Sequence, residues 1–249
     1  MRTAAGVSSR DRQILADPRR SRVTLLAACI AVLLATSALT GCNATSPTGG
    51  APQNEPTPTA LYPGEVRQYQ GKNLSSIQDF YENSIKGPQK VDIKTYRLSI
   101  AGEVQTPLKL TYDEVLARKI YDKVVTLHCV EGWKVDIWWE GVLISDLLKQ
   151  AGADMTSKIV VFRAADGFST SLPLDFIVSN NILLASKMNG VVIPPERGYP
   201  FMVVAEDRWG YKWCKWVTAI EVSKDESFRG YWEQRGYSNT ATLERQFSN

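Results

Sequence analysis

The most informative stretch of this chain reads Val124-Val125-Thr126-Leu127-His128-Cys129-Val130-Glu131-Gly132-Trp133. Its first four residues are β-branched or apolar, which predicts a short strand. The strand leads to a cysteine on a polar turn that ends at Gly132, and a second strand is expected over residues 134–139. A thiol on a loop at the end of a buried strand is well placed to be a metal ligand or a nucleophile. The alternative is that Cys129 is a small buried apolar residue, as most free cysteines are.

The segment His128-Cys129-Val130-Glu131-Gly132-Trp133, followed by Trp138-Trp139-Glu140-Gly141-Val142, resembles the cofactor-ligating segment of the sulfite oxidase-type molybdopterin oxidoreductases. In that family the cysteine thiolate binds molybdenum beside the two dithiolene sulfurs of a single pterin. The resemblance therefore implies that Cys129 is both the metal ligand and the catalytic residue. The form Cys-Val-Glu-Gly-Trp is more similar to the bacterial periplasmic methionine sulfoxide reductase branch than to the sulfite oxidases. The latter carry an arginine pair shortly after the cysteine, and this chain does not.

Residues 1–42 are expected to be a leader that is not part of the fold. Three arginines precede an apolar run over residues 23–38, which is short for a membrane span. The run ends in Leu39-Thr40-Gly41-Cys42, which resembles the lipobox of bacterial lipoproteins and implies lipidation of Cys42. This implies export and attachment by lipid to the outer face of a bacterial membrane. An uncleaved signal anchor is the alternative, and a twin-arginine export route stays open.

The remaining chain is expected to consist of a flexible tether, residues 43–64, and one domain, residues 65–249. The tether is rich in Ser, Thr, Pro, Gly and Gln, and the whole chain of 249 residues has an ordinary globular composition with 44% hydrophobic residues. The leader holds six basic and two acidic residues, so the 23 basic and 24 acidic residues that remain nearly cancel. Nucleic acid as a partner therefore has no compositional support.

Turn and periodicity signals predict a single α+β domain of mixed β-sheets with short helices, without βαβ alternation. Two helices are expected, one opened by the capping box Thr111-Tyr112-Asp113-Glu114 and running to about Lys119, and one over residues 144–151. The pairs Asp166-Gly167 and Asn189-Gly190 predict two hairpins. Further strands are expected over residues 96–100, 201–205 and 213–222.

Further segments resemble the same family in the same order, at residues 166–173, 182–190, 197–201 and 210–216. A pterin needs donors for its ring edges and cations for its phosphate. The resemblance implies that the residues that bind the molybdopterin cofactor are Gln78, Tyr81, Glu82, His128, Arg163, Arg197, Lys212 and Lys215. The alternative for Arg197 and Lys212 is a solvated surface cation. Lys215 is expected between two tryptophans on a strand, where an unpaired cation would be costly.

The chain also departs from the family pattern. Met202 stands where the family usually has an arginine, and Phe168 stands where sulfite oxidases have an active-site tyrosine. Together with the missing arginine pair, these departures remove groups that would bind a small dianion such as sulfite. A more apolar pocket is expected, formed by Phe168, Met202, Trp133 and Trp138.

The resemblance implies an oxidoreductase that carries out two-electron oxygen-atom transfer at a cysteine-ligated molybdenum, first of all the reduction of an S-oxide or N-oxide of a small molecule or peptide. Two alternatives stay open, a sulfite oxidase-like dehydrogenase and a metal-free binding lipoprotein on the same fold. The sequence holds neither a Cys-x-x-Cys-His haem motif nor an iron–sulfur cysteine set, so a separate haem- or quinone-linked protein is expected to exchange electrons with it. Only Cys129 and Cys214 remain in the domain, and a metal-bound Cys129 would leave Cys214 as a free thiol.

Overall fold

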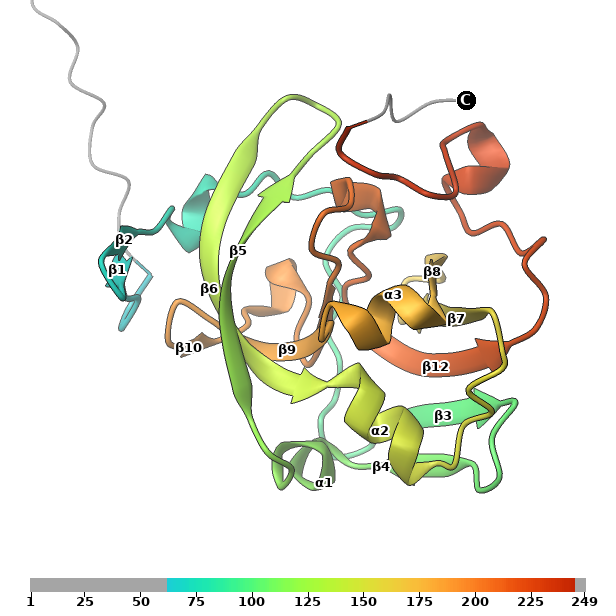
Figure 1. Ribbon diagram of the computed structural model, residues 1–249. Coiled ribbons are helices and arrows are strands. Elements are labelled where there is room, and N and C mark those ends of the chain that lie inside the picture. The colour runs from blue at the N-terminus through green and yellow to red at the C-terminus, as the bar shows by residue number, and fades with distance from the viewer. Residues whose placement is uncertain (1–61, 245–249) are drawn as a thin grey trace, which may run out of the picture. The chain divides into compact units, whose positions relative to one another are not determined.

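Two five-stranded sheets organise the part of the chain that this computed structural model describes, residues 62–244 (Figure 1). The expected leader, the lipid site at Cys42 and most of the expected tether lie outside the described residues. Within residues 62–244, no helix combines the length and the apolar character that crossing a membrane requires. The predicted fold class, mixed sheets with short helices, is confirmed.

The first sheet is built on a long antiparallel hairpin that contains the cysteine stretch. Its strands are β5 (Tyr121–His128), β6 (Lys134–Leu143), β9 (Leu183–Met188), β10 (Val191–Val192) and β11 (Met202–Val204). β6 pairs with β5 on one side and β9 on the other, and β9 also pairs with β10 and β11. The predicted turn at Asn189-Gly190 joins β9 to β10.

β6 shows why this hairpin is a stable support. Val135, Ile137 and Trp139 alternate along the strand and are all buried, so one face of β6 lies in the core. At Gly141 the strand passes so close to β9 that an added Cβ would lie 2.1 Å from the carbonyl oxygen of Leu184. Only glycine fits this close crossing.

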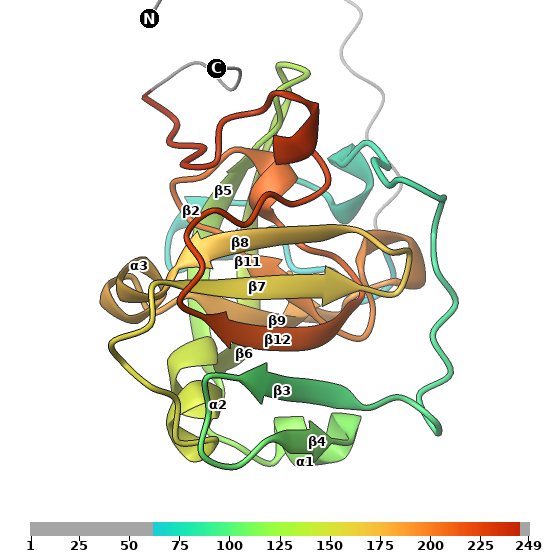
Figure 2. The same ribbon diagram turned by 90° about the vertical axis from the view of Figure 1, so that its right-hand side faces the viewer.

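The second sheet has the order β4-β3-β12-β7-β8, which Figure 2 shows face on. Its strands are β3 (Leu98–Gly102), β4 (Leu108–Leu110), β7 (Ile159–Ala164), β8 (Ser169–Pro173) and β12 (Val217–Ser223). β12 pairs in parallel with β3 and antiparallel with β7, so a strand from the end of the chain occupies the centre of the sheet. The predicted turn at Asp166-Gly167 joins β7 to β8.

Three short helices follow individual strands: α1 (Tyr112–Leu116), α2 (Ile144–Gln150) and α3 (Leu174–Ser179). The predicted capping box of α1 is present, although the helix ends at Leu116 rather than near Lys119. α2 forms as expected and buries residues at helical spacing, Ile144, Leu147 and Leu148. α3 was not predicted, because its nearly continuous apolar run over six residues carries no clear helical period.

The remaining elements are short. They are the ribbon of β1 (Gln68–Tyr69) and β2 (Lys72–Asn73) and four 3₁₀ turns, η1 (Ile77–Asp79), η2 (Pro195–Arg197), η3 (Gly210–Lys212) and η4 (Glu233–Arg235).

One strand prediction was wrong in its extent. The strand expected over residues 213–222 begins only at Val217, because Trp216 has a φ of 48°, which a β-strand does not allow. Lys215 is therefore not on a strand.

Candidate functional site

The thiol of Cys129 lies at the tip of the β5–β6 hairpin, directly after β5 ends. The backbone N–H of Cys129 donates to the carbonyl of Trp133 (2.9 Å), and the N–H of Gly132 donates to the carbonyl of Cys129 (3.0 Å). η3 packs against this tip, because a Cβ added to Gly210 would lie 3.2 Å from the His128 carbonyl oxygen and 3.6 Å from Cα of Cys129. These contacts place the thiol in a rigid turn.

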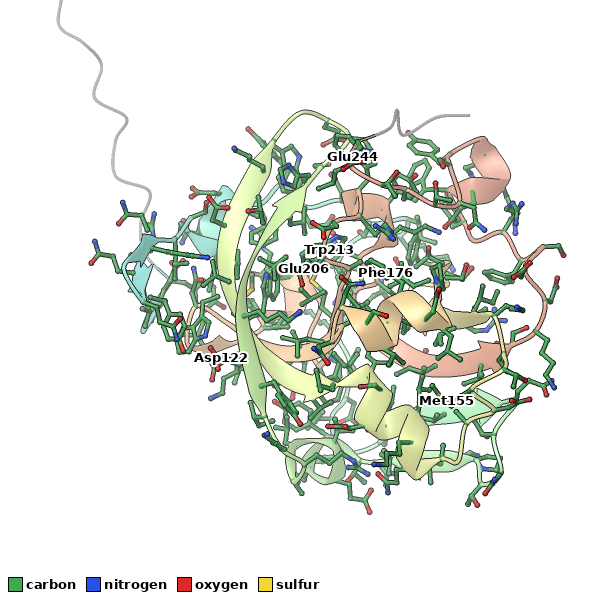
Figure 3. The ribbon with its side chains drawn as sticks, viewed as in Figure 1. Asp122, Met155, Phe176, Glu206, Trp213 and Glu244 are labelled. Carbon is green, nitrogen blue, oxygen red and sulfur yellow. The ribbon has the colours of Figure 1, made fainter. Side chains whose placement is uncertain are left out.

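Cys129 lines a cavity of about 350 Å³ whose lining includes nine aromatic side chains. Trp133 and Tyr81 form one side, with ring centroids 5.7 Å apart. Trp213, labelled in Figure 3, is buried and lines the interior. Phe168 and Met202 also line the cavity, as the apolar-pocket prediction requires.

The same prediction was wrong for Trp138. Its indole is not among the cavity residues and instead stacks on Tyr69 with 4.0 Å between ring centroids. Trp138 lies one residue before the buried Trp139, so it faces the opposite side of β6.

Asn83 and Glu131 surround the thiol, and sequence reasoning missed both. The side-chain amide of Asn83 lies 3.5 Å from the sulfur of Cys129 and donates to Glu131 (3.0 Å). Trp133 also donates to Glu131 (3.1 Å), and the two bonds lower the pKa of this carboxyl. Burial is the main cause that raises the pKa of Cys129, and a coordinated metal ion would reverse this by favouring the thiolate. Asn83 could have been found from its position in the sequence, because it directly follows Tyr81 and Glu82, which the resemblance implies to bind the cofactor.

Two cations form a corner of the cavity, which we call the cationic corner: Arg197 and Lys215. Lys215 Nζ lies 2.9 Å from Glu82 Oε1 and 4.4 Å from the ring centroid of Trp216. Arg197 donates through Nε to the carbonyl of Ile77 (3.1 Å). Burial is the main cause that lowers the pKa of both cations, so an anion bound between them would stabilise their charged forms.

The two cations are held next to each other by the backbone. Gly198 has a φ of 125°, and a Cβ added there would lie 3.1 Å from Cβ of Lys215. The carbonyl of Gly198 also accepts a hydrogen bond from the N–H of Trp216 (3.1 Å). A glycine is thus required for residue 197 and residue 215 to face the same cavity.

Four of the residues implied to bind the cofactor do not line the cavity: Gln78, His128, Arg163 and Lys212. Gln78 is exposed on η1, and His128 bridges to Trp209 through its backbone. Arg163 is exposed on the second sheet and forms a bidentate pair with Glu221 (2.8 and 2.9 Å).

Lys212 does not line the cavity, and its side chain is paired within the fold. Its side chain is 0% exposed and forms an ion pair with Glu233, whose side chain is also 0% exposed. It donates further to the carbonyl of Ser171 (3.0 Å) and to Asn239 (3.2 Å). The partner lies in the C-terminal tail, residues 224–244, and no local sequence pattern points to it.

This C-terminal tail also supplies cavity residues that carried no recognisable motif. Trp232 and Tyr237 line the same cavity as Cys129. Their ring centroids are 5.2 Å apart, and Tyr237 also contacts Tyr211 at 5.1 Å. The structure therefore brings together Cys129, Tyr81, Glu82, Arg197 and Lys215 from the predicted set, and adds Asn83, Glu131 and the two tail aromatics.

The donor set can be tested against a metal held by a pterin. Among the described residues, no group of three or more His, Cys, Asp or Glu side chains could hold a metal ion. Among the described residues that line the cavity, Cys129 is the only one that can offer a thiolate, so a metal here needs further ligands, and the two sulfurs of a pterin dithiolene would meet that need. The cationic corner suits the phosphate of such a group. Cys214 is a free, fully buried thiol, and Cys129 is free as well.

A family model described as oxidoreductase molybdopterin binding domain matches residues 85–232. The chain is 34% identical to the uncharacterized oxidoreductase YuiH of Bacillus subtilis, over 60% of this chain and 76% of that protein. It is 27% identical to the protein-methionine-sulfoxide reductase catalytic subunit MsrP of Burkholderia mallei, over 75% of this chain and 62% of the relative. It is 28% identical to the mitochondrial sulfite oxidase of Homo sapiens, over 64% of this chain and 34% of that protein.

Among solved structures, the sulfane dehydrogenase SoxCD of Paracoccus pantotrophus shares the fold, with a TM-score of 0.55 and 24% identity. That match covers 62% of this chain and 43% of the SoxCD chain. The chain thus spans less than two thirds of the reductase subunit, the sulfite oxidase and the sulfane dehydrogenase.

Proposed function

The chain belongs to the family of the oxidoreductase molybdopterin binding domain, the sulfite oxidase-type molybdopterin oxidoreductases, and on this premise we propose that it reduces an S-oxide or an N-oxide. We further propose that it works outside the cytoplasm, held by a lipid on Cys42 to the outer face of a bacterial membrane. The anchor rests on the lipobox-like Leu39-Thr40-Gly41-Cys42.

The charge of the cavity lining is the observation that carries the choice of substrate. Among the described residues, the only cations that line the cavity are those of the cationic corner, and Lys215 is already paired with Glu82. Four carboxylates line it: Glu82, Glu131, Asp166 and Glu196. A sulfite dianion would therefore meet an excess of negative charge, and it would compete with the cofactor phosphate for the same cations. A neutral oxide meets neither difficulty.

The residues of the cavity have separable roles in this proposal. Cys129 provides the thiolate ligand, and the amide of Asn83 orients its sulfur and its neighbour Glu131. Arg197 and Lys215 hold the phosphate of the cofactor. When bound, the molybdenum cofactor supplies two-electron oxygen-atom transfer. The net reaction takes two electrons and two protons and converts the oxide to its reduced form and water.

The aromatic walls bind the organic part of the substrate and exclude water from the thiol. Trp133 and Phe168 present apolar surface to the cavity, and Met202 adds a polarizable thioether. A small molecule or an exposed peptide side chain that carries the oxide fits this lining. We propose that a separate haem- or quinone-linked protein delivers the electrons. The relative named as a catalytic subunit supports the idea of a second component.

The test is to produce the full chain in bacteria that make the cofactor and to measure molybdenum, pterin and turnover. Reduced methyl viologen would serve as electron donor, with dimethyl sulfoxide, methionine sulfoxide and trimethylamine N-oxide as acceptors. Sulfite with ferricyanide would test the opposite direction. Oxide reduction by metal-loaded protein supports the proposal. Sulfite oxidation without oxide reduction would assign the dehydrogenase instead, and protein without metal would indicate a binding lipoprotein.

A further inference from the structure

After β12 the C-terminal tail passes over β8 (Figure 2), and hydrogen bonds join it to two separate segments. The N–H of Tyr231 donates to the carbonyl of Ser169 (2.9 Å), and the N–H of Trp209 donates to the carbonyl of Ala241 (2.9 Å). Gly230 passes so close to β8 that an added Cβ would lie 2.3 Å from the Ser169 oxygen. The tail is therefore a fixed part of the described structure near the cavity.

The Lys212–Glu233 pair fastens the tail from inside. Both side chains are inaccessible to solvent, and Glu233 also accepts a hydrogen bond from the hydroxyl of Thr170 (2.7 Å). Lys212 additionally reaches Asn239, so one ammonium group holds two positions of the tail. Two buried opposite charges tolerate little displacement, because separating them leaves each charge unpaired in an apolar setting.

The fastened segment carries the two tail aromatics that share a cavity with Cys129, Trp232 and Tyr237. The family match ends at residue 232, so Glu233, Tyr237 and Asn239 lie beyond the part that this chain shares with the family model. Tyr237 of the cavity lining therefore lies outside the family match. The cationic corner, which we propose for the cofactor phosphate, is formed by other residues of the cavity. The wall formed by Trp232 and Tyr237 is therefore available to the substrate.

We propose that the C-terminal tail determines substrate specificity: Trp232 and Tyr237 bind the organic substituent of the oxide, and Lys212 and Glu233 are positioning residues that hold them in place. The proposal rests on the function proposed above. It assigns the chain to uncharged oxides with an aromatic or large apolar substituent, because two neighbouring rings offer such a group stacking and apolar contact. A small oxide such as dimethyl sulfoxide carries no aromatic or large apolar substituent that could pack against these two rings.

The experiment compares Trp232→Ala with the parent holoenzyme on methyl phenyl sulfoxide and dimethyl sulfoxide. We expect kcat/KM for the phenyl compound to fall about tenfold, mainly through KM, while the value for dimethyl sulfoxide stays within about twofold. Trp232→Phe keeps an aromatic ring and should retain most of the parent's preference for methyl phenyl sulfoxide over dimethyl sulfoxide. Phe228→Ala removes an aromatic side chain from the same tail that does not line the cavity, and should leave both values unchanged. Lys212→Met should change the preference in the same direction as Trp232→Ala.

A second measurement keeps this proposal distinct from the proposed function. Binding of methyl phenyl sulfoxide to the holoprotein is followed by calorimetry, whether or not turnover occurs. Weaker binding by Trp232→Ala with unchanged molybdenum and pterin content supports the tail as the specificity wall. The inference is wrong, and the tail is only structural, if the variant binds the phenyl compound as tightly as the parent. The same holds if its kcat/KM falls equally for both sulfoxides. Binding without reduction of either sulfoxide would count against the proposed function alone.

Discussion

Lys215 Nζ lies 2.9 Å from Glu82 Oε1, so a cation of the cationic corner is paired with a carboxylate that lines the same cavity. The two residues are 133 positions apart in the chain. Glu82 belongs to the segment before residue 85, where the family match begins. This pair joins that segment to the cationic corner, where we propose that the cofactor phosphate binds.

Lys215→Met should lower the pterin content of the purified protein. The methionine keeps the apolar contact with Trp216 but cannot bind a phosphate, and losing a hydrogen bond to a charged group costs about 1.5–3 kcal/mol, or at least about tenfold in affinity. Pterin is measured by fluorescence after oxidative release. Arg163→Met is the control, because Arg163 pairs with Glu221 away from the cavity. Equal pterin in Lys215→Met and the parent would remove Lys215 from the phosphate site.

Cys129→Ser should lose redox activity while it keeps its fold and much of its pterin. A hard oxygen donates less electron density to the metal than a thiolate does, and the change in volume is small. Cys214→Ala is the matched control, because Cys214 is buried and does not line the cavity. The oxo-transfer rate, the molybdenum content and the visible spectrum are compared among the three proteins. An unchanged rate and spectrum in Cys129→Ser would refute the ligand assignment.

Cys214 should be a free thiol in metal-loaded protein. Alkylation under denaturing conditions without reductant, followed by peptide mapping, should label Cys214 as well as Cys129. Burial raises the pKa of the Cys214 thiol well above its ordinary value, so labelling of the native protein should be slow by comparison. A disulfide between the two cysteines in metal-replete protein would contradict both this prediction and the proposed site.

Cys42→Ala should release the protein from the membrane fraction without changing the folded domain. Several acyl chains on one residue give stable anchoring, and none can be attached without the thiol. Membrane and soluble fractions are compared by immunoblot, and mass spectrometry of the parent identifies the modification. A parent protein with an unmodified Cys42 and its leader still attached would show that no lipid anchor exists.

Lys212→Met should destabilise the domain by about 3–5 kcal/mol, because it leaves Glu233 charged and buried without its partner. The double variant Lys212→Met/Glu233→Leu should recover most of this loss, since no buried charge remains. Urea unfolding of the metal-free proteins gives both values. Lys224→Met is the control, because its ion pairs with Glu103 and Asp154 are exposed. A single variant as stable as the parent would show that the buried pair contributes little.

The sequence was sufficient to predict those structural elements that depend on residues close together in the chain. The β5–β6 hairpin, the capping box at Thr111 and the turns at Gly167 and Gly190 depend on neighbouring residues, and all four appear in the structure. Resemblance to the family also identified Arg197 and Lys215, which do share a cavity with Cys129.

The predicted residues that lie outside the cavity lining include side chains whose partners are distant in the chain. Lys212 carries the same charge as Lys215 three residues later, but only the fold shows that Glu233 of the tail binds it. Arg163 was placed near the pterin by resemblance, whereas its neighbour across the second sheet, Glu221, pairs with it. Trp232 carried no motif, because an aromatic residue in a tail packs equally well against many surfaces.

The position of β12 has a consequence for how the protein is made. β12 lies between β3 and β7, yet it is the last strand of the described chain. On the ribosome, the pairs β3–β4 and β7–β8 emerge well before residues 217–223, and each keeps an open edge until the joining strand arrives. Translation that stops before Val217 leaves these two strand pairs without the strand that joins them. The second sheet is therefore completed by a strand that is synthesised after its other four strands, although that strand lies at the centre of the sheet.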